Sequence, residues 1–136
     1  MTMTQKKVLI VDDSKLMRII IKKILSTDDM FIVTGEAGNG IEALAEIEKD
    51  IPDIIFLDIE MPEMDGVEAL KEIRAKYSTK VVVVSSVAQM GSSRAAEVNQ
   101  LGADAIIEKP GGAVDPTLAS QKGKEFIEIA RKVLGL

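Results

Sequence analysis

The chain contains no cysteine and no histidine among its 136 residues. Without cysteine it can form neither a disulfide scaffold nor a thiolate nucleophile. Without histidine it lacks the imidazole base of a catalytic triad and the commonest zinc ligand. These two absences exclude nucleophilic Ser-His or Cys-His catalysis and zinc chemistry, and with them much of enzyme chemistry.

Positive charge is also scarce, because 17 basic residues face 22 acidic ones and the net charge is −5. Such a chain has no overall positive field to attract a phosphate backbone or an anionic membrane, so we expect no autonomous nucleic-acid binding and no membrane association. Long apolar runs are missing, and the polar start, residues 1–7, is followed by no apolar signal core. We therefore expect a cytoplasmic location.

What the chain does have is the composition of an ordinary globular domain, with 46% hydrophobic and 29% charged residues. Its length falls within the usual size of one domain and leaves no room for a second catalytic domain. No linker or low-complexity tract interrupts it. We expect residues 1–136 to form a single domain.

Short apolar runs rich in β-branched residues alternate with amphipathic stretches along the chain. The runs are typical of strands buried on both faces and cover residues 8–11, 31–34, 54–57, 81–84 and 105–107. Apolar residues spaced by three and four predict a helix after each strand, with Ser14 and Asn39 as caps of the first two. An irregular stretch, residues 111–120, precedes the last helix. This alternation predicts an α/β fold with a doubly wound parallel sheet and right-handed crossovers.

Polar residues stand where the predicted strands end, and in open parallel sheets ligands bind outside these carboxyl ends. Each has a simpler explanation when taken alone, since Asp before a helix is usually a cap and a Ser-Ser pair is usually a turn. Their joint placement at four strand ends favours a site in which the loops converge. The residues are Asp12, Asp13, Asp58, Ser85, Ser86 and Lys109.

Three carboxylates, from Asp12, Asp13 and Asp58, need a compensating cation if they meet. At about 5 Å each pair repels by roughly 3 kcal/mol at an effective dielectric constant near 20. Mg²⁺ is the natural candidate because it prefers oxygen ligands and shares its coordination sphere with substrate phosphate oxygens. Lys109 adds a second positive charge that can hold a carboxylate or a phosphoryl oxygen. With no Gly-rich phosphate loop, the pattern favours phosphoryl transfer onto an aspartate.

Three segments resemble the response-regulator receiver family of two-component signalling: residues 8–14 (VLIVDDS), 57–66 (LDIEMPEMDG) and 108–110 (EKP). The resemblance covers almost the whole chain. It implies a flavodoxin-like fold with a five-stranded parallel sheet, which takes a phosphoryl group from a histidine kinase with only weak self-catalysis. It implies that Asp58 is the phosphoacceptor and that Mg²⁺ is bound by Asp12, Asp13, Asp58 and the backbone carbonyl of Glu60. It further implies that Lys109, Ser85 and Ser86 bind the phosphoryl group.

The same resemblance makes Ser85 the hydroxyl switch and implies a cis peptide bond between Lys109 and Pro110. Ile106 stands three residues before Lys109, where many family members carry a Tyr or Phe that changes rotamer with the switch, so an aromatic readout is not expected.

Within the family, residues 84–87 and 91–92 resemble the regulatory domain of chemotaxis methylesterases. The catalytic domain of those enzymes is absent, because the chain has no Gly-x-Ser-x-Gly motif and no histidine. The output is therefore expected to be a downstream target protein or a missing C-terminal output domain.

Two functions from other classes fit parts of the pattern. A Mg²⁺-dependent phosphohydrolase is suggested by residues 58–60, which mimic an Asp-x-Asp pair, but it would want that pair after the first strand and a substrate cap. A flavin mononucleotide binder would place its phosphate against Asp12 and Asp13, where two carboxylates repel it. Flavin absorbance tests this second alternative.

Overall fold

The computed structural model describes residues 4–86, 91–109 and 116–136, with side chains in the last range from residue 122 onward. Five parallel strands form one sheet in the order β2-β1-β3-β4-β5, and a helix follows each strand in the chain. The strands are β1 (Lys6–Val11), β2 (Phe31–Ala37), β3 (Ile54–Asp58), β4 (Lys80–Ser85) and β5 (Ala105–Glu108). The helices are α1 (Lys15–Leu25), α2 (Gly40–Lys49), α3 (Gly66–Lys76), α4 (Ser93–Gln100) and α5 (Pro116–Val133). This confirms the doubly wound, flavodoxin-like fold.

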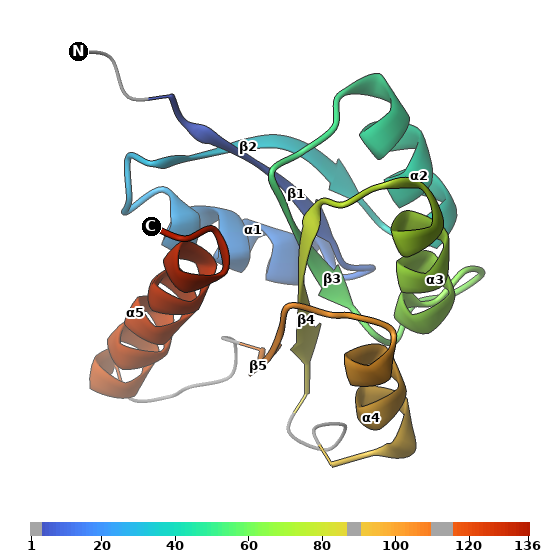
Figure 1. The fold of residues 1–136 in the computed structure, drawn as a ribbon. Helices are drawn as coiled ribbons and strands as arrows, with labels where there is room; N and C mark the ends of the chain where they lie inside the picture. The colour runs from blue at the N-terminus through green and yellow to red at the C-terminus, as the bar shows by residue number, and fades with distance from the viewer. Residues whose placement is uncertain (1–3, 87–90, 110–115) are drawn as a thin grey trace.

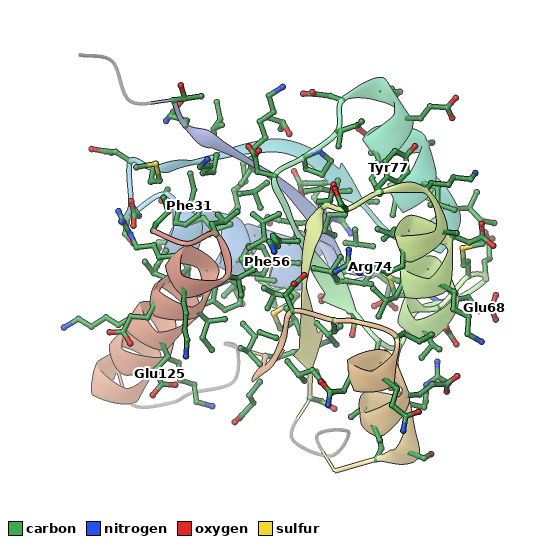
Figure 2. The ribbon with its side chains drawn as sticks, viewed as in Figure 1. Phe31, Phe56, Glu68, Arg74, Tyr77 and Glu125 are labelled. Atoms are coloured by element: carbon green, nitrogen blue, oxygen red, sulfur yellow. The ribbon has the colours of Figure 1, made fainter. Side chains whose placement is uncertain are left out.

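The helices lie in two layers, with α1 and α5 on one face of the sheet and α2, α3 and α4 on the other (Figure 1). Strands β1, β3 and β4 are buried on both faces, which explains their unbroken apolar runs. Successive side chains of β3 point to opposite layers. Leu57 packs in the layer of α2 and α3. Phe56, labelled in Figure 2, packs in the layer of α1 and α5, where its ring stacks on that of Phe126 with the ring centroids 4.6 Å apart. The central strands are thus clamped from both sides, which fixes where their carboxyl ends lie.

Side-chain caps set the first residue of four helices. The predicted caps Ser14 and Asn39 are confirmed, and each accepts a hydrogen bond from the backbone N–H three residues later. Asp65 caps α3 and Ser92 caps α4 in the same way. Because these helices begin directly after the loops at the carboxyl edge of the sheet, the caps also hold the ends of those loops.

Two predicted boundaries are wrong by three residues or more. Strand β2 runs beyond residue 34 to Ala37, and a bulge pairs Val8 with Val33 but Leu9 with Gly35. The glycine interrupts the apolar pattern in the sequence, yet it leaves room for the Leu9 side chain against β2. The predicted irregular stretch 111–120 is wrong for residues 116–120, because α5 begins at Pro116. Proline suits the first helical turn, where its missing N–H would have no helical partner.

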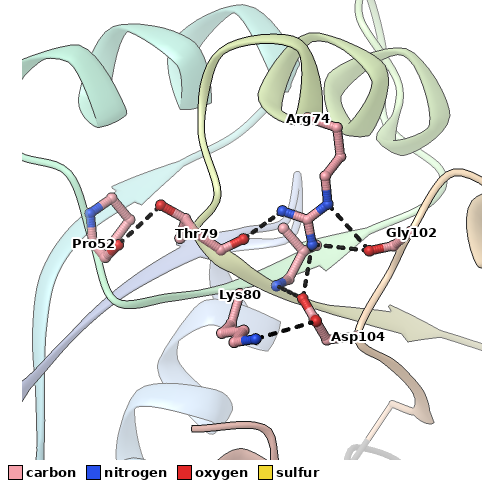
Figure 3. Close-up of polar contacts among 7 residues, drawn as sticks. Pro52, Arg74, Thr79, Lys80, Gly102 and Asp104 are labelled. Atoms are coloured by element: carbon pink, nitrogen blue, oxygen red, sulfur yellow. Dashed lines mark hydrogen bonds and ion pairs between the residues drawn. The ribbon is translucent and has the colours of Figure 1, made fainter.

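The opposite edge of the sheet, at the amino ends of the strands, is held by a polar network around Arg74 of α3 (Figure 3). Its guanidinium donates to the carbonyl oxygens of Thr79 at 2.5 Å and Gly102 at 2.9 Å and pairs with Asp104 at 2.7 Å. The carboxylate of Asp104 also accepts from the N–H of Val81. These contacts tie α3, β4 and the turn before β5 together.

None of the helices in the described part of the chain is long and apolar enough to cross a membrane.

Candidate functional site

The carboxyl ends of β3, β4 and β5 open into one cleft of about 430 Å³. Asp58 and Ser85 are the last residues of their strands, which each end one residue later than predicted. Ile106 lies elsewhere, on β5, where it lines a groove against α4 and another against α5. The cleft is lined by Asp13, Asp58, Ile59, Glu60, Met61, Pro62, Ser85, Ser86 and Lys109.

Three carboxylates gather at this cleft. Oxygen atoms of Asp12, Asp13 and Asp58 all lie within 4.8 Å of one another. Asp12 and Asp58 are only 1% and 3% exposed, whereas Asp13 faces solvent. Two of the three charges are therefore poorly hydrated, which makes their mutual repulsion stronger than it would be in water.

Asp12 is held by its surroundings except at one oxygen. Its N–H donates to the carbonyl oxygen of Ala37 at 3.0 Å, and its Oδ1 accepts from the N–H of Ser14 at 2.9 Å. Its buried Oδ2 has no hydrogen-bond partner among the described residues. A buried carboxylate oxygen without a donor is costly, so this atom fits the role of a ligand to a cation.

Lys109 supplies a positive charge that pairs with two of these carboxylates. Its Nζ lies 3.3 Å from Oδ2 of Asp58 and 3.6 Å from Oδ2 of Asp12. Burial by itself would lower the pKa of Lys109, but the charges of Asp58 and Asp12 outweigh burial and raise it. Lys109 is therefore a firmly protonated ammonium that faces two buried carboxylates.

One ammonium does not fully compensate these carboxylates. Burial, reinforced by the charge of Asp12 and opposed by Lys109, raises the pKa of Asp58 to about 6. Burial also raises the pKa of Asp12, against the hydrogen bond from Ser14 and the charge of Lys109. The arrangement is thus poised to gain from a further cation, and Mg²⁺ suits an all-oxygen donor set of this kind.

The loop between β3 and α3 is fitted closely to Asp58. The N–H of Glu60 donates to Asp58 Oδ1 at 3.3 Å, and the N–H of Gly66 donates to the carbonyl oxygen of Ile59 at 2.8 Å. A Cβ atom at position 66 would overlap the carbonyl oxygen of Asp58. Glycine at the first residue of α3 therefore lets the helix begin against the backbone of Asp58.

Ser85 is almost fully buried at the end of β4. Its hydroxyl donates to the carbonyl oxygen of Ser86 at 3.3 Å, and its own carbonyl oxygen accepts from the N–H of Lys109 at 2.8 Å. Ser85 and Lys109 are thus linked across the β4–β5 pair. Val87 and Pro110, and with Pro110 the expected cis peptide bond, lie outside the described residues.

Two arginines with contacts to the site loops were missed in the sequence. The Nη1 of Arg18 donates to the carbonyl oxygen of Asp12 at 2.6 Å, and Arg94 of α4 pairs with the cap residue Asp65. The only sequence signal for Arg18 is a basic residue in the second turn of a helix that follows the acidic pair. Arg94 gives no comparable signal, because its partner lies 29 residues away.

Comparison with known proteins places the chain in a family. Residues 8–117 match the model of the response regulator receiver domain. The chain is 41% identical to protein-glutamate methylesterase/protein-glutamine glutaminase 1 of Syntrophomonas wolfei, over 88% of this chain and 34% of that protein. It is 36% identical to the corresponding protein of Pyrococcus horikoshii, over 96% of this chain and 37% of that protein. It therefore spans about a third of the length of these curated relatives.

Solved structures agree with this assignment. The response regulator domain of Thermotoga maritima CheB superposes with a TM-score of 0.84 at 37% identity, covering 97% of this chain and 98% of that one. A chain from the complex of the CheA3 P1 domain with CheY6 of R. sphaeroides superposes with a TM-score of 0.81 at 38% identity, over 98% and 99% of the two chains. From the family match, these relatives and the acidic cleft at the carboxyl edge of the sheet, we conclude that the chain belongs to the response regulator receiver domains.

Proposed function

We propose that Asp58 accepts a phosphoryl group in a Mg²⁺-dependent reaction and that the resulting aspartyl phosphate changes the conformation of the domain. The observation that carries this proposal is the position of Asp58. It ends the central strand β3, with Asp12 and Asp13 oxygens within 4.8 Å and the Lys109 ammonium at 3.3 Å.

The chemistry needs little beyond positioning and charge neutralisation. A carboxylate oxygen of Asp58 would form a bond to phosphorus while the bond from phosphorus to the donor nitrogen breaks, and the leaving nitrogen takes a proton. Lys109 would hold a phosphoryl oxygen. Mg²⁺, held by Asp12, Asp13, Asp58 and the carbonyl oxygen of Glu60, would neutralise charge on the phosphoryl group.

We further propose that the donor is a phosphohistidine of a sensor histidine kinase. The complex of the CheA3 P1 domain with CheY6, one chain of which is 38% identical to this one, supports a donor of this class. Such a kinase draws its phosphoryl group from ATP, which would place the domain in the cytoplasm. We propose that residues 1–136 act as one receiver domain, whose output is a downstream target or an output domain such as the rest of the methylesterase relatives.

Ser85 is the proposed switch. Its buried hydroxyl has only a 3.3 Å contact with its neighbour's carbonyl oxygen, so it is free to turn toward a phosphoryl group at Asp58. Ser86 lines the same cleft and would contact the phosphoryl group from the side of β4. Ile106 would respond only by filling space as Ser85 moves.

Phosphorylation by a small-molecule donor tests the proposal. The protein is incubated with Mg²⁺ and phosphoramidate, and its intact mass is measured for a labile phosphoryl adduct. We expect Asp58→Asn to remove the adduct and Asp53→Asn, at the amino end of β3, to retain it. Equal incorporation in Asp58→Asn and wild type would overturn the proposal.

A further inference from the structure

We propose that Arg18 is a positioning residue of the magnesium site, which fixes Asp12 so that one of its carboxylate oxygens stays available to the ion. The inference rests on the proposed function, because it concerns the ion that phosphoryl transfer at Asp58 requires. It starts from the contact between Arg18 Nη1 and the carbonyl oxygen of Asp12, which at 2.6 Å is a short, charge-assisted hydrogen bond.

Three of the four polar atoms of Asp12 make hydrogen bonds, and the fourth does not. Its N–H, its carbonyl oxygen and its Oδ1 are bound to Ala37, Arg18 and Ser14 in turn. Only Oδ2 lacks a hydrogen bond within the described ranges, and this oxygen faces Lys109 at 3.6 Å. Arg18 is the one side chain among the three partners, so it is the contact that a substitution can remove.

Arg18 reaches Asp12 from α1 because a second contact holds its guanidinium in place. The Nε of Arg18 lies 3.3 Å from Oε1 of Glu36 on the edge strand β2, and the Arg18 side chain is only 19% exposed. The planar guanidinium thus spans β1 and β2 with two nitrogens at once, a geometry that the single ammonium of lysine cannot reproduce. The order Glu36–Arg18–Asp12 resembles the outer contacts that orient metal ligands in other proteins.

Positioning and electrostatics predict opposite effects at this residue. Arg18 is a cation, so its charge alone repels Mg²⁺, and its removal would tighten metal binding. If Arg18 instead positions Asp12, its removal lets the carboxylate turn away and weakens metal binding. Substitution of an orienting partner typically lowers metal affinity by a factor of 10 to 100, and we expect about tenfold here.

Lys22 offers a matched control. It lies 3.7 Å from Oε2 of the same Glu36 and carries the same charge, but it pairs with Glu36 rather than with Asp12. We expect Lys22→Ala to leave the Mg²⁺ dissociation constant unchanged or slightly lower. Arg18→Lys keeps the charge but loses the two-nitrogen contact, so we expect it to bind Mg²⁺ more weakly than wild type, as does Arg18→Ala.

The experiment is a calorimetric Mg²⁺ titration of wild type, Arg18→Ala, Arg18→Lys, Glu36→Gln and Lys22→Ala. Amide exchange of the Ser14 N–H is measured by NMR in metal-free protein, because this N–H reports how firmly Asp12 Oδ1 is held. We expect faster exchange at Ser14 in both Arg18 variants and in Glu36→Gln, but not in Lys22→Ala. Glu36→Gln leaves Arg18 in place but removes its anionic partner. If Arg18→Ala does not fold, the comparison of Glu36→Gln with wild type tests the inference in its place.

The outcomes separate the two proposals. Wild type that binds no Mg²⁺ would overturn the proposed function. Wild-type binding with unchanged or tighter binding in Arg18→Ala, and with Arg18→Lys equal to wild type, would show that Arg18 acts only through its charge and would overturn this inference. Loss of affinity in the Arg18 variants with normal exchange at Ser14 would also overturn it, because the carboxylate would then not have moved.

Discussion

The folded protein disfavours the ionised form of the Asp58 carboxyl group. Its carboxyl group is 3% exposed beside the carboxylate of Asp12, and the single ammonium of Lys109 offsets only part of the lost hydration. The pKa of about 6 expresses this imbalance, because a carboxyl that ionises above its ordinary value of 3.8 is more stable protonated in the folded state. The site is thus built for ligand binding at the expense of stability.

We expect Asp58→Asn to be more stable than wild type at neutral pH in the absence of metal. Between pH 3.8 and about 6 the folded wild type retains a proton that the unfolded chain releases, so its stability falls as the pH rises through this window and stays low above it. At about 1.4 kcal/mol per pKa unit the full difference is about 3 kcal/mol.

Urea denaturation in EDTA from pH 3.5 to 8 measures this difference. The gap between the two proteins should be absent near pH 3.5, full above pH 6.5 and smaller when Mg²⁺ is added to wild type. Equal stability of wild type and Asp58→Asn at pH 7.5 would show that the fold does not disfavour the ionised form of Asp58.

Gly66→Ala should disrupt the site through its backbone. The added methyl group would overlap the carbonyl oxygen of Asp58, so α3 and the loop before it must shift, and overpacking of this kind costs about 1–3 kcal/mol. We expect lower urea stability together with weaker Mg²⁺ binding. Gly91→Ala is the matched control, because a Cβ atom there meets nothing within 4 Å among the described residues. Normal Mg²⁺ binding by Gly66→Ala would contradict the close fit.

Helix α4 has a thin apolar face against the sheet. It spans eight residues, and only Ala95 and Val98 among them are buried. Its first turn is also held by the ion pair from Arg94 to Asp65, which caps α3 beside the loop that follows Asp58. The position of α4 is therefore connected to the loop that follows Asp58 by this ion pair, in addition to the hydrophobic cluster that Ala95 and Val98 share with Ile59 and Met61 of that loop.

Arg94→Ala should loosen α4 without unfolding the domain. Loss of a partly buried ion pair of about 1 kcal/mol corresponds to roughly fivefold faster local opening. We expect amide exchange to rise by this factor in α4 and to stay unchanged in β1 and β3. Lys71→Ala, which removes the exposed contact between Lys71 and Glu97 at 3.8 Å, is the control and should change little. Similar exchange in all three proteins would contradict a holding role for Arg94.

The proposed switch gives a second expectation for α4. Ser85→Ala should still accept a phosphoryl group at Asp58 but should blunt the response of α4, since the hydroxyl that would move is gone. Ile106→Val should leave the response nearly intact, because Ile106 lines the grooves beside α4 and α5 rather than the cleft that holds Asp58. Hydrogen exchange with and without beryllofluoride measures both. If α4 responds equally in wild type and Ser85→Ala, the hydroxyl is not the coupling group.

The two edges of the sheet carry different polar clusters. The carboxyl edge carries the buried carboxylates, and the amino edge carries the Arg74 network that joins α3, β4 and the turn before β5. The strands of the sheet connect the two edges, and β3 is buried along its whole length from Ile54 to Asp58. We therefore expect that a substitution at the amino edge can weaken the contacts there without moving the cleft at the carboxyl edge.

Arg74→Ala should lower the stability of the whole domain while leaving its Mg²⁺ affinity unchanged. The substitution removes donors from three acceptors, the carbonyl oxygens of Thr79 and Gly102 and the carboxylate of Asp104. Hydrogen bonds to charged groups contribute about 1.5–3 kcal/mol, and we expect a loss of about 2 kcal/mol in urea denaturation. Lys80→Ala, which removes a 3.9 Å exposed contact with Asp104, should cost far less. A parallel loss of Mg²⁺ affinity would contradict the independence of the two edges.

The sequence by itself determined the order in which strands and helices follow one another along the chain, and the residue types at the strand ends. Alternating periodicity and the caps Ser14 and Asn39 are local signals, so they could be read before any fold was known. It failed at β2 and at the start of α5, where Gly35 and Pro116 looked like breaks in regular structure. Gly35 fits into β2 because the strand has a bulge there beside Leu9. Pro116 fits into α5 because it is the first residue of the helix.

Only the tertiary structure decided how Asp12 and Asp58 are held and which side chains hold them. The Lys109 contacts and the ion pair of Arg94 join residues that are far apart in the chain, and the fit of Gly66 against Asp58 depends on how the loop between them folds. Arg18 lies only six residues from Asp12, yet its contact depends on Glu36 from another strand. Such distances and burial follow from packing, because a sequence pattern specifies which face a residue occupies but not which atoms it meets there.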